Sequence, residues 1–282
     1  MATLYLVSTP IGNLDDLSAR AAETLRSVQR ILAEDTRRTR ILTERVGASA
    51  PLVSLHAHNE AERVERIVGW LDAGDDLALV SDAGTPLVSD PGGRVVGAVV
   101  AAGHRVVPIP GPSATLAALV ASGLPTGRFT FLGFVARRGK ARAADLDRVV
   151  EGDETTVLFE SPQRLVTLLD DLAGSCEPER KVAVARELTK VHEEVVRGTL
   201  PEVAGYYRER PPRGEVTVVV GPAVRDGRKG VSDQDAARLA RELLKDGMRP
   251  SAAARELGRR LHLARNDAYR IVHDLEGTST DE

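Results

Sequence analysis

The segment from Ser81 to Gly92 constrains the fold of this chain more than any other. It reads SDAGTPLVSDPG and directly follows the apolar run Leu77–Val80. An apolar run ended by turn-forming residues is typical of a buried strand, and open α/β sheets bind ligands beyond the carboxyl ends of such strands. A similar junction joins Val106–Ile109 to Pro110–Ala114, where Ser113 is an expected helix N-cap. One such junction would be an ordinary turn, but the pair predicts a single pocket.

Short apolar runs alternate with helical patterns through the first part of the chain. One helical stripe holds Leu17, Ala21, Leu25 and Val28, and a second holds Val64, Ile67, Val68 and Leu71. Asn59 and Glu62 have the spacing of a capping box at the start of the second helix. The alternation predicts a mostly parallel sheet with helices on its faces. Its expected strands are Leu4–Val7, Ile31–Ala33, Leu52–Leu55, Leu77–Val80 and Val106–Ile109.

A second block of strands follows the breaker-rich segment Ser122–Gly127, which predicts a domain boundary. The run around His192–Arg197 precedes the last strand of this block and predicts an antiparallel hairpin or meander, so the second sheet is expected to be mixed. Its other expected strands are Phe129–Phe134, Thr155–Phe159, Lys181–Ala185 and Glu215–Val220.

The last part of the chain is predicted to be helical. The polar stretch Arg225–Gly230 has the composition of a linker, and three apolar stripes after it predict a small helical bundle. Ala254 and Gly258 have the spacing of a helix-turn-helix turn, which is a weak pattern. The expected fold class is therefore α/β, with an N-terminal α/β domain over 1–122, a second α/β domain over 123–224 and a helical tail domain over 232–278.

Composition excludes several classes of protein. The chain has 282 residues, is 42% hydrophobic and 28% charged, and is typical of a soluble globular protein. Only 3% of residues are aromatic, so stacking platforms for single-stranded nucleic acid are scarce. Cys176 is the only cysteine, which excludes intramolecular disulfides and fits a reducing compartment. No apolar run approaches the ~20 residues that span a bilayer, so we expect a cytoplasmic protein without a membrane partner.

Familiar nucleotide and metal motifs are absent. No G-x-G-x-x-G follows the first strand, and Gly133–Lys140 has one residue too many between its glycines for a P-loop. His192-Glu193 lacks the second histidine of a zinc protease helix. The pair His56 and His58 is more often a strand end than a metal site, so no metal is expected.

Polar clusters do follow most of the expected strands. Taken singly, each has an ordinary explanation: Asp35 with Arg37 fits a surface ion pair, and Glu160 fits a helix N-terminal acid. Together they predict a shared crevice, because strand ends of an open α/β sheet converge. The clusters are Ser8–Leu14, Glu34–Arg37, His56–Glu60, Glu160–Pro162 and Arg186–Lys190.

These clusters resemble those of the ribosomal RNA methyltransferase branch of the tetrapyrrole methylase superfamily. The resemblance covers the chain from near its first residue to the helical tail. The wider superfamily has different glycine-rich loops at Pro10–Asn13 and Ser81–Pro86, so these two loops identify the branch. The matching segments are, in order, Thr9–Leu14, Ala33–Arg37, His58–Glu60, Ser81–Pro86, Ser89–Gly92, Pro110–Ala114, Glu160–Pro162 and Ala185–Lys190.

The resemblance implies an enzyme with S-adenosylmethionine between two α/β domains, and a homodimer. The implied reaction is methyl transfer to the ribose 2′-hydroxyl of a cytidine in the decoding region of 16S rRNA, free or in the small ribosomal subunit. The implied cofactor contacts are Pro10, Asp82, Ala83, Gly84, Thr85, Pro86, Pro112, Ser113 and Ala114, with Phe159 and Leu188 from the second domain.

Such a reaction needs a group that helps the ribose hydroxyl lose its proton. The candidates are Glu34 and Asp35 from the first domain and Glu187 and Lys190 from the second, and the sequence does not choose among them. Expected anchors for RNA phosphates are Arg37 and Arg186, a cationic loop of Arg137, Arg138, Lys140 and Arg142, and the tail arginines Arg255, Arg259, Arg260 and Arg265.

Two other functions fit parts of the pattern. A methyltransferase of the same superfamily could act on a tetrapyrrole or a protein side chain, but the basic tail and the branch-specific loops disfavour this reading. A non-catalytic RNA-binding adaptor would keep the fold as a scaffold, and the polar clusters in both domains disfavour it.

Overall fold

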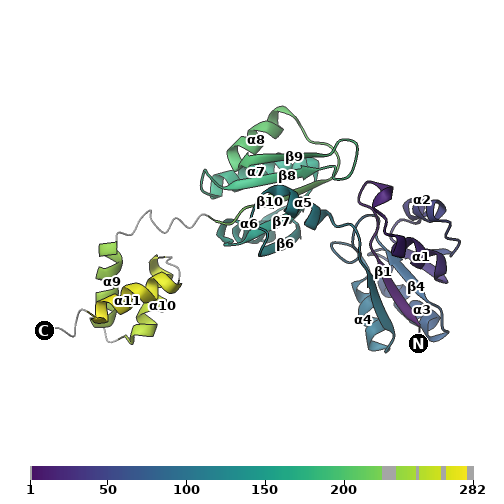
Figure 1. Cartoon of the computed structure of the whole chain (residues 1–282), viewed down its shortest axis with the longest axis horizontal. Helices are drawn as coiled ribbons and strands as arrows, with labels where there is room; N and C mark the ends of the chain where they lie inside the picture. The colour runs from purple at the N-terminus through teal and green to yellow at the C-terminus, as the bar shows by residue number, and fades with distance from the viewer. Residues whose placement is uncertain (1, 224–232, 246–247, 262–264, 278–282) are drawn as a thin grey trace. The chain divides into compact units, whose positions relative to one another are not determined.

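A computed structural model describes residues 2–223, 233–245, 248–261 and 265–277 of the chain (Figure 1). The chain divides into two compact units, Met1–Ala223 and Val224–Glu282. The first unit holds two five-stranded sheets, and the second holds helices. No helix among the described residues is long and apolar enough to span a membrane.

The first sheet is parallel throughout, as the alternating pattern predicted. Its strand order is β3-β2-β4-β1-β5, so β1 lies between β4 and β5. The bounds are β1 Thr3–Val7, β2 Arg30–Ala33, β3 Leu52–Ser54, β4 Leu77–Val80 and β5 Arg105–Ile109. The connecting elements are the short 3-10 helix η1 Leu14–Asp16 and the helices α1 Ala19–Ser27, α2 Thr36–Val46, α3 Glu60–Asp72 and α4 Gly93–Ala101.

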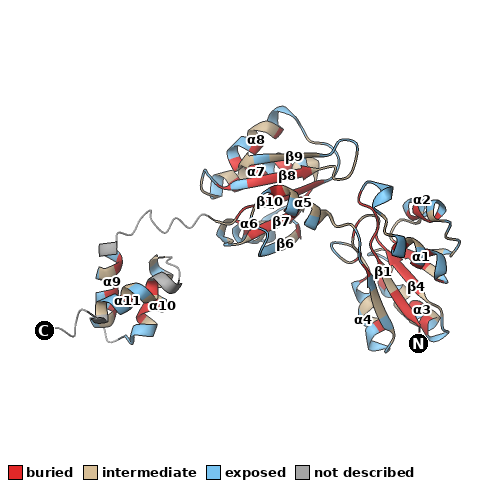
Figure 2. Cartoon of the chain, viewed as in Figure 1, coloured by how far each residue is buried: buried red, intermediate tan, exposed pale blue. Residues whose placement is uncertain are grey.

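Separate apolar clusters cover the two faces of this sheet. Figure 2 shows buried residues along its strands. Leu25 of α1 and Leu42 of α2 pack on one face, and Ile67 of α3 and Val99 of α4 pack on the other. Helix α3 begins where the sequence predicted, but the capping box is wrong. The Asn59 side chain accepts a hydrogen bond from the His56 backbone N–H at 2.9 Å and does not cap the helix.

The second sheet is mixed, as predicted, with the strand order β6-β7-β10-β8-β9. β6 and β7 are parallel, whereas β10 is antiparallel to both β7 and β8, and β9 is antiparallel to β8. The bounds are β6 Phe129–Phe134, β7 Thr155–Glu160, β8 Lys181–Arg186, β9 Glu194–Thr199 and β10 Val216–Val220.

Helices also cover both faces of the second sheet. α7 Pro162–Ser175 and α8 Leu200–Glu209 pack on one face together with α6 Gly139–Glu151, in a cluster that includes Leu168 and Tyr207. α5 Ala114–Ser122 packs on the other face through Ala118 and Leu119. Helix α5 therefore follows the last strand of the first sheet in sequence but belongs to the core of the second. The domain boundary after Ser122 stays a prediction.

The second unit contains α9 Asp233–Lys245, α10 Pro250–Leu261 and α11 Arg265–Gly277 around a core of its own, with Leu243, Leu257 and Val272 buried. Ala254 and Gly258 both lie inside α10, so the helix-turn-helix turn expected at these residues is wrong. The expected linker Arg225–Gly230 lies outside the described residues.

Candidate functional site

Three loops that follow neighbouring strands of the first sheet are tied to one another. Thr9, after β1, exchanges two backbone hydrogen bonds with Gly84, after β4, at 2.9 and 3.0 Å. The Thr85 hydroxyl donates to the Pro112 carbonyl oxygen, after β5, at 3.3 Å. Gly84 adopts a left-handed φ of 81°, which glycine accepts at little cost. Because β4, β1 and β5 are adjacent and parallel, their carboxyl ends bring these loops together as the sequence predicted.

The second sheet brings its own strand ends to one edge. In the antiparallel ladders Val216 at the start of β10 pairs with Glu160 at the end of β7 and with Arg186 at the end of β8. Phe134 at the end of β6 pairs with Phe159 in the parallel ladder, and their rings lie 5.4 Å apart. Residues that are distant in sequence therefore form one wall.

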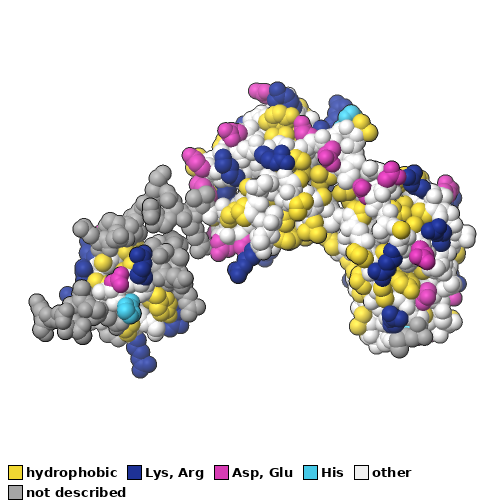
Figure 3. All heavy atoms as spheres, viewed as in Figure 1, with side chains coloured by type: hydrophobic (Ala, Val, Ile, Leu, Met, Phe, Trp, Pro, Cys, Tyr) yellow, Lys and Arg dark blue, Asp and Glu magenta, His cyan; other side chains and the backbone are white. Residues whose placement is uncertain are grey.

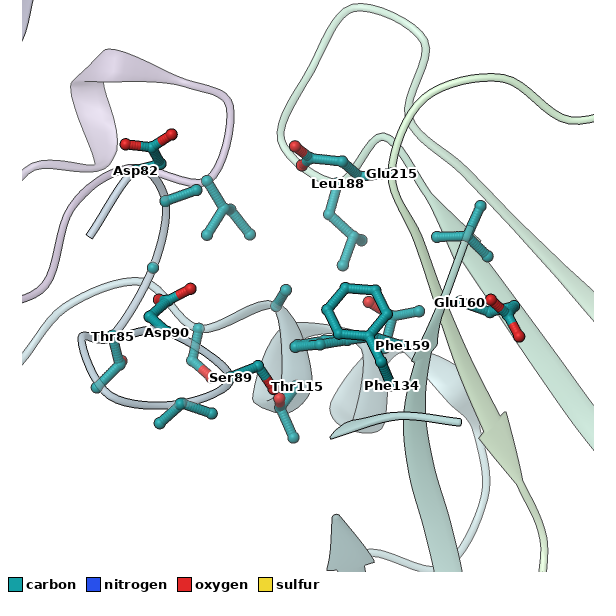
Figure 4. Close-up of a pocket in the computed structure, with 18 of the residues that line it drawn as sticks. Asp82, Thr85, Ser89, Asp90, Thr115, Phe134, Phe159, Glu160, Leu188 and Glu215 are labelled. Atoms are coloured by element: carbon teal, nitrogen blue, oxygen red, sulfur yellow. The ribbon is translucent and has the colours of Figure 1, made fainter. Parts of the chain in front are cut away.

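The loops and this wall line one cleft of about 420 Å³ (Figure 4). Figure 4 shows Asp82, Thr85, Ser89 and Asp90 on one side and Phe134, Phe159, Glu160, Leu188 and Glu215 on the other. Cofactor pockets in proteins commonly have this size and combine apolar walls with a few polar groups. The remaining lining includes Ile11, Glu34, Arg38, Ala83, Gly84, Val88, Ser113, Ala114, Thr115 and Ala185.

Two buried polar atoms in the lining of this cleft have no hydrogen-bond partner among the described residues. They are the Thr115 hydroxyl, on a residue that is 6% exposed, and Oε2 of Glu160, on a residue that is 2% exposed. The other Glu160 oxygen accepts from the Ser161 backbone N–H at 2.7 Å and pairs with Arg164. Buried polar groups in native proteins nearly always have a partner, so these two atoms are available to bond water or a polar ligand.

Three carboxylates line the side of the cleft that the first sheet provides: Glu34, Asp82 and Asp90. Arg38 pairs with Asp82 at 3.4 Å, and Asp82 also accepts from the Asp35 backbone N–H at 3.0 Å. Partial burial and then the charge of Asp82 raise the pKa of Glu34. Partial burial and then the charge of Glu34 raise the pKa of Asp90 to about 6. Asp90 is not among the site residues that were predicted from the sequence.

Asp35 does not line the cleft. It is the N-cap of α2, where its carboxylate accepts from the Arg37 backbone N–H at 2.9 Å. Hydrogen bonds from the Arg37 guanidinium, and then from the backbone, hold the pKa of Asp35 well below its usual range. A carboxylate held in this way is a weak proton acceptor, so Asp35 has the surroundings of a structural cap.

Glu187 and Lys190 form a network with Glu215 at the edge of the cleft. Lys190 Nζ lies 2.9 Å from Glu187 and 3.1 Å from Glu215. The Glu215 backbone N–H and then Lys190 lower the pKa of Glu187. Burial opposes protonation of Lys190, but its hydrogen bonds to Glu187 and Glu215 raise its pKa on balance. Of these three side chains only Glu215 lines the cleft, and Lys190 remains charged.

The structure brings most of the predicted cofactor residues together. Asp82, Ala83, Gly84, Thr85, Ser113, Ala114, Phe159 and Leu188 line the cleft, whereas Pro10, Pro86 and Pro112 do not. Sequence reasoning missed Phe134, Asp90 and Thr115. Asp90 lies in the segment Ser81–Gly92, but nothing in a linear sequence indicates that its carboxylate faces the cleft.

The predicted RNA-binding residues differ in their exposure and in whether they form ion pairs. Arg137, Arg138 and Lys140 are exposed, and no ion pair joins them to a described residue. Arg142 pairs with Asp171 at 2.6 Å, and Arg186 pairs with Glu194 at 3.2 Å. In the tail, Arg255 is exposed and Arg260 pairs with Glu256. The side chains of Arg259 and Arg265 lie outside the described residues.

Comparison with known proteins identifies the class. The family Tetrapyrrole (Corrin/Porphyrin) Methylases matches residues 3–204. A Thermus thermophilus uroporphyrin-III C-methyltransferase, solved in complex with S-adenosyl homocysteine, has the same fold, with a TM-score of 0.57, 22% identity and coverage of 79% of this chain and 99% of that one. The chain therefore has the tetrapyrrole methylase fold.

Two curated relatives identify the branch. Ribosomal RNA small subunit methyltransferase I of Synechocystis sp. is 42% identical over 98% of this chain and 99% of that protein. The protein of the same name from Xylella fastidiosa is 47% identical over 90% of this chain and 92% of that one. This chain belongs to the ribosomal RNA small subunit methyltransferase I family of tetrapyrrole methylases. It is a methyltransferase, and its methyl donor is S-adenosylmethionine.

The cleft residues fit this donor. Phe134, Phe159 and Leu188 offer an apolar wall that suits a purine base, and the unpartnered Thr115 hydroxyl can bond to a polar group of the ligand. The carboxylates on the opposite side favour a ligand that carries positive charge.

Proposed function

We propose that this chain methylates the ribose 2′-hydroxyl of a cytidine in the decoding region of 16S rRNA. The observation that carries the proposal is near-complete coverage by relatives that are named as ribosomal RNA small subunit methyltransferases, at 42–47% identity. The cleft supports it, because it combines surroundings that fit S-adenosylmethionine with carboxylates able to accept a proton.

Bound S-adenosylmethionine supplies an activated methyl group on a positively charged sulfur. The chain must then hold the ribose hydroxyl in line with that methyl group, since orientation accounts for a large part of such a rate enhancement. The loops tied together through Thr9, Gly84, Thr85 and Pro112 give the cleft a fixed shape. Their backbone N–H and C=O groups are available for this positioning.

A basic helix next to the cleft suits an RNA strand. α2 presents Arg37, Arg38, Arg40 and Arg45 against a single acid, Glu44, and Arg38 lines the cleft itself. The cationic loop that the sequence predicted is partly helical, because Lys140 and Arg142 lie in the first turn of α6 and Arg138 is its N-cap. We propose that α2 and the segment Arg137–Lys140 contact RNA phosphates. Figure 3 shows charges of both signs interspersed over the visible face of the first unit, so attraction to RNA rests on such local groups.

A primer-extension or mass map of 16S rRNA tests the substrate. RNA from a strain that lacks the gene is incubated with the purified protein and S-adenosylmethionine. We expect one new ribose methyl group, on a cytidine of the decoding region. Methylation of a base, or of no RNA at all despite donor binding by calorimetry, would contradict the proposal. A protein that binds no donor would be a non-catalytic RNA-binding adaptor. Methylation of a tetrapyrrole or a protein side chain would identify a methyltransferase of the same superfamily with another substrate.

We further propose a cytoplasmic homodimer, as the resemblance implied. Val120 on α5 is 73% exposed and Leu116 is 51% exposed, which leaves apolar surface available for a second copy. Sedimentation of the purified protein distinguishes a dimer from a monomer.

A further inference from the structure

We propose that the Asp90 carboxylate is the general base that takes the proton from the ribose hydroxyl. This inference rests on the proposed function and adds a catalytic residue to it. In the step the O–H bond breaks and its proton goes to Asp90 while the ribose oxygen bonds to the methyl carbon. The carbon–sulfur bond breaks at the same time, and its electron pair remains on sulfur.

The position of Asp90 supports this role. Asp90 lines the cleft, and Figure 4 shows its carboxylate facing the open space between the two walls. The loop that carries it is held in an unusual shape, since Leu87 and Ser89 have left-handed φ angles of 73° and 71°. Such angles are costly for residues other than glycine and are found most often where a side chain must be placed for function.

The charges around Asp90 suit a base that works near neutral pH. Glu34, at the end of β2, and Asp82, on the same loop, face it with like charge, and Arg38 pairs with Asp82. No ion pair joins Asp90 to any described residue. Burial, then Glu34 and, more weakly, Asp82 raise the pKa of Asp90 to about 6, although a contact with the Ser81 hydroxyl opposes the shift. A general base is most effective when its pKa lies close to the working pH.

The other candidate groups are less suited. Asp35 is bound by Arg37, and Glu187 is bound by Lys190 and by the Glu215 backbone. Lys190 is kept protonated by two carboxylates. Three further carboxylates line the cleft, and each is held by a cation: Asp82 by Arg38, Glu160 by Arg164 and Glu215 by Lys190. Glu34 is therefore the remaining competitor, because it also lines the cleft and its pKa is also raised.

Single-turnover methylation of 16S rRNA from pH 5 to 9, with donor and RNA saturating, tests the assignment. We expect the wild-type rate to rise with pH along a single acidic limb, set by the titration of Asp90, and then to level off. Asp90→Asn should slow the step by about 100-fold or more at every pH on the plateau. Calorimetry should show donor affinity within a few-fold of wild type. The matched control Asp147→Asn, on the exposed side of α6, should leave the profile unchanged.

A second variant shows which of the two carboxylates, Asp90 or Glu34, is the general base. Glu34→Gln removes the like charge next to Asp90, so the midpoint of the remaining activity should move to lower pH. If Glu34 were the base, the pH-dependent limb would disappear in Glu34→Gln and persist in Asp90→Asn, which would overturn the inference. Asp90→Asn with a rate within 10-fold of wild type would also overturn it and leave the proposed function intact. Wild-type protein that methylates no ribose would overturn both.

Discussion

Thr115 shows how a single residue can be unfavourable for the free protein and useful for binding. Its hydroxyl is buried at the cleft without a partner, on the second residue of α5. A buried polar group without a hydrogen bond costs about 1–3 kcal/mol. That cost is recovered when a ligand supplies the missing bond.

Replacing this threonine tests the argument. Thr115→Val keeps the shape and removes the hydroxyl, so we expect unchanged or higher thermal stability of the free protein. The donor should bind about 3- to 10-fold more weakly, which corresponds to roughly 1 kcal/mol for one hydrogen bond. Calorimetry and thermal denaturation measure the two quantities. Thr39→Val, at a buried threonine of α2 that does not line the cleft, is the control for donor affinity. Equal donor affinity of Thr115→Val and wild type would contradict the assignment.

The raised pKa of Asp90 predicts a pH-dependent cost of folding. Its carboxyl has a pKa of about 6 in the folded state against an ordinary value of 3.8. Between these values the folded state binds more protons than the unfolded state, so the free energy of unfolding falls as pH rises from about 4 to about 6. Asp90→Asn stays neutral, so its melting temperature should exceed that of wild type at pH 8, with a difference that shrinks toward pH 4. A lower melting temperature of the variant at pH 8 would show that Asp90 stabilises the fold.

At the scale of elements, α2 joins the cleft to a basic surface. Arg40 is exposed on this helix, and no described residue forms an ion pair with it, whereas Arg37, Arg38 and Arg45 each have an acidic partner. From Arg37 to Arg45 the helix rises about 12 Å. Arg40 is therefore the cation of α2 whose charge is most available to a phosphate.

Removing this charge should weaken RNA binding. Arg40→Ala is expected to raise the dissociation constant for 16S rRNA a few-fold and to reduce the slope of log affinity against log salt by about 1, as for one lost phosphate contact. Filter binding between 50 and 200 mM salt measures both. Arg105→Ala is the matched control, because Arg105 is exposed at the amino end of β5, away from the cleft edge of the sheet. A salt slope equal to that of the wild type would remove α2 from the RNA surface.

Arg180 stabilises the C-terminal end of α6. Its side chain is fully buried, and Nη2 donates to the Val149 carbonyl oxygen at 2.6 Å, in the last turn of α6. A cation at a helix C-terminus satisfies carbonyl groups that the helix leaves unpaired. Arg180→Leu should therefore lower the free energy of unfolding by roughly 2–4 kcal/mol, because the buried Val149 carbonyl oxygen loses its donor and the ion pair with Glu177 is lost. Arg148→Leu, at an exposed position on the same helix, is the control in urea denaturation.

Strands were predicted well because a buried strand is a continuous apolar run with breakers at its ends. β6 Phe129–Phe134 has the predicted bounds, and β7 and β8 each extend one residue beyond the prediction. The start of α3 was predicted for the wrong reason. Asn59 bonds to the preceding turn through His56, a local alternative that the capping-box spacing does not reveal. The turn expected at Ala254 and Gly258 was predicted wrongly. Gly258 does not end the helix, and both residues lie inside α10.

At the scale of the whole molecule, the cleft could be predicted only in part. Loop residues such as Gly84 and Ser113 follow their strands closely, so their position in the cleft follows from the parallel topology. Asp35 and Lys190 were candidates by residue type, yet hydrogen bonds from Arg37 lower the pKa of Asp35, and hydrogen bonds to Glu187 and then Glu215 raise the pKa of Lys190. Asp90 was missed because its raised pKa comes from burial at the cleft and then from Glu34, which is distant in sequence. Long-range electrostatics of this kind requires coordinates.

The division into two compact units predicts that donor binding and RNA binding can be separated. The unit Met1–Ala223 contains both sheets, their cores and every residue that lines the cleft. A chain that ends at Ala223 should therefore bind S-adenosylmethionine as the full chain does. Between Arg249 and Arg270 the sequence has six arginines against two acids, so loss of this segment should weaken rRNA binding and lower its salt dependence. Calorimetry with the donor and filter binding with rRNA measure the two affinities. Loss of donor binding would show that the second unit supports the cleft, and unchanged rRNA affinity would restrict the RNA surface to the first unit.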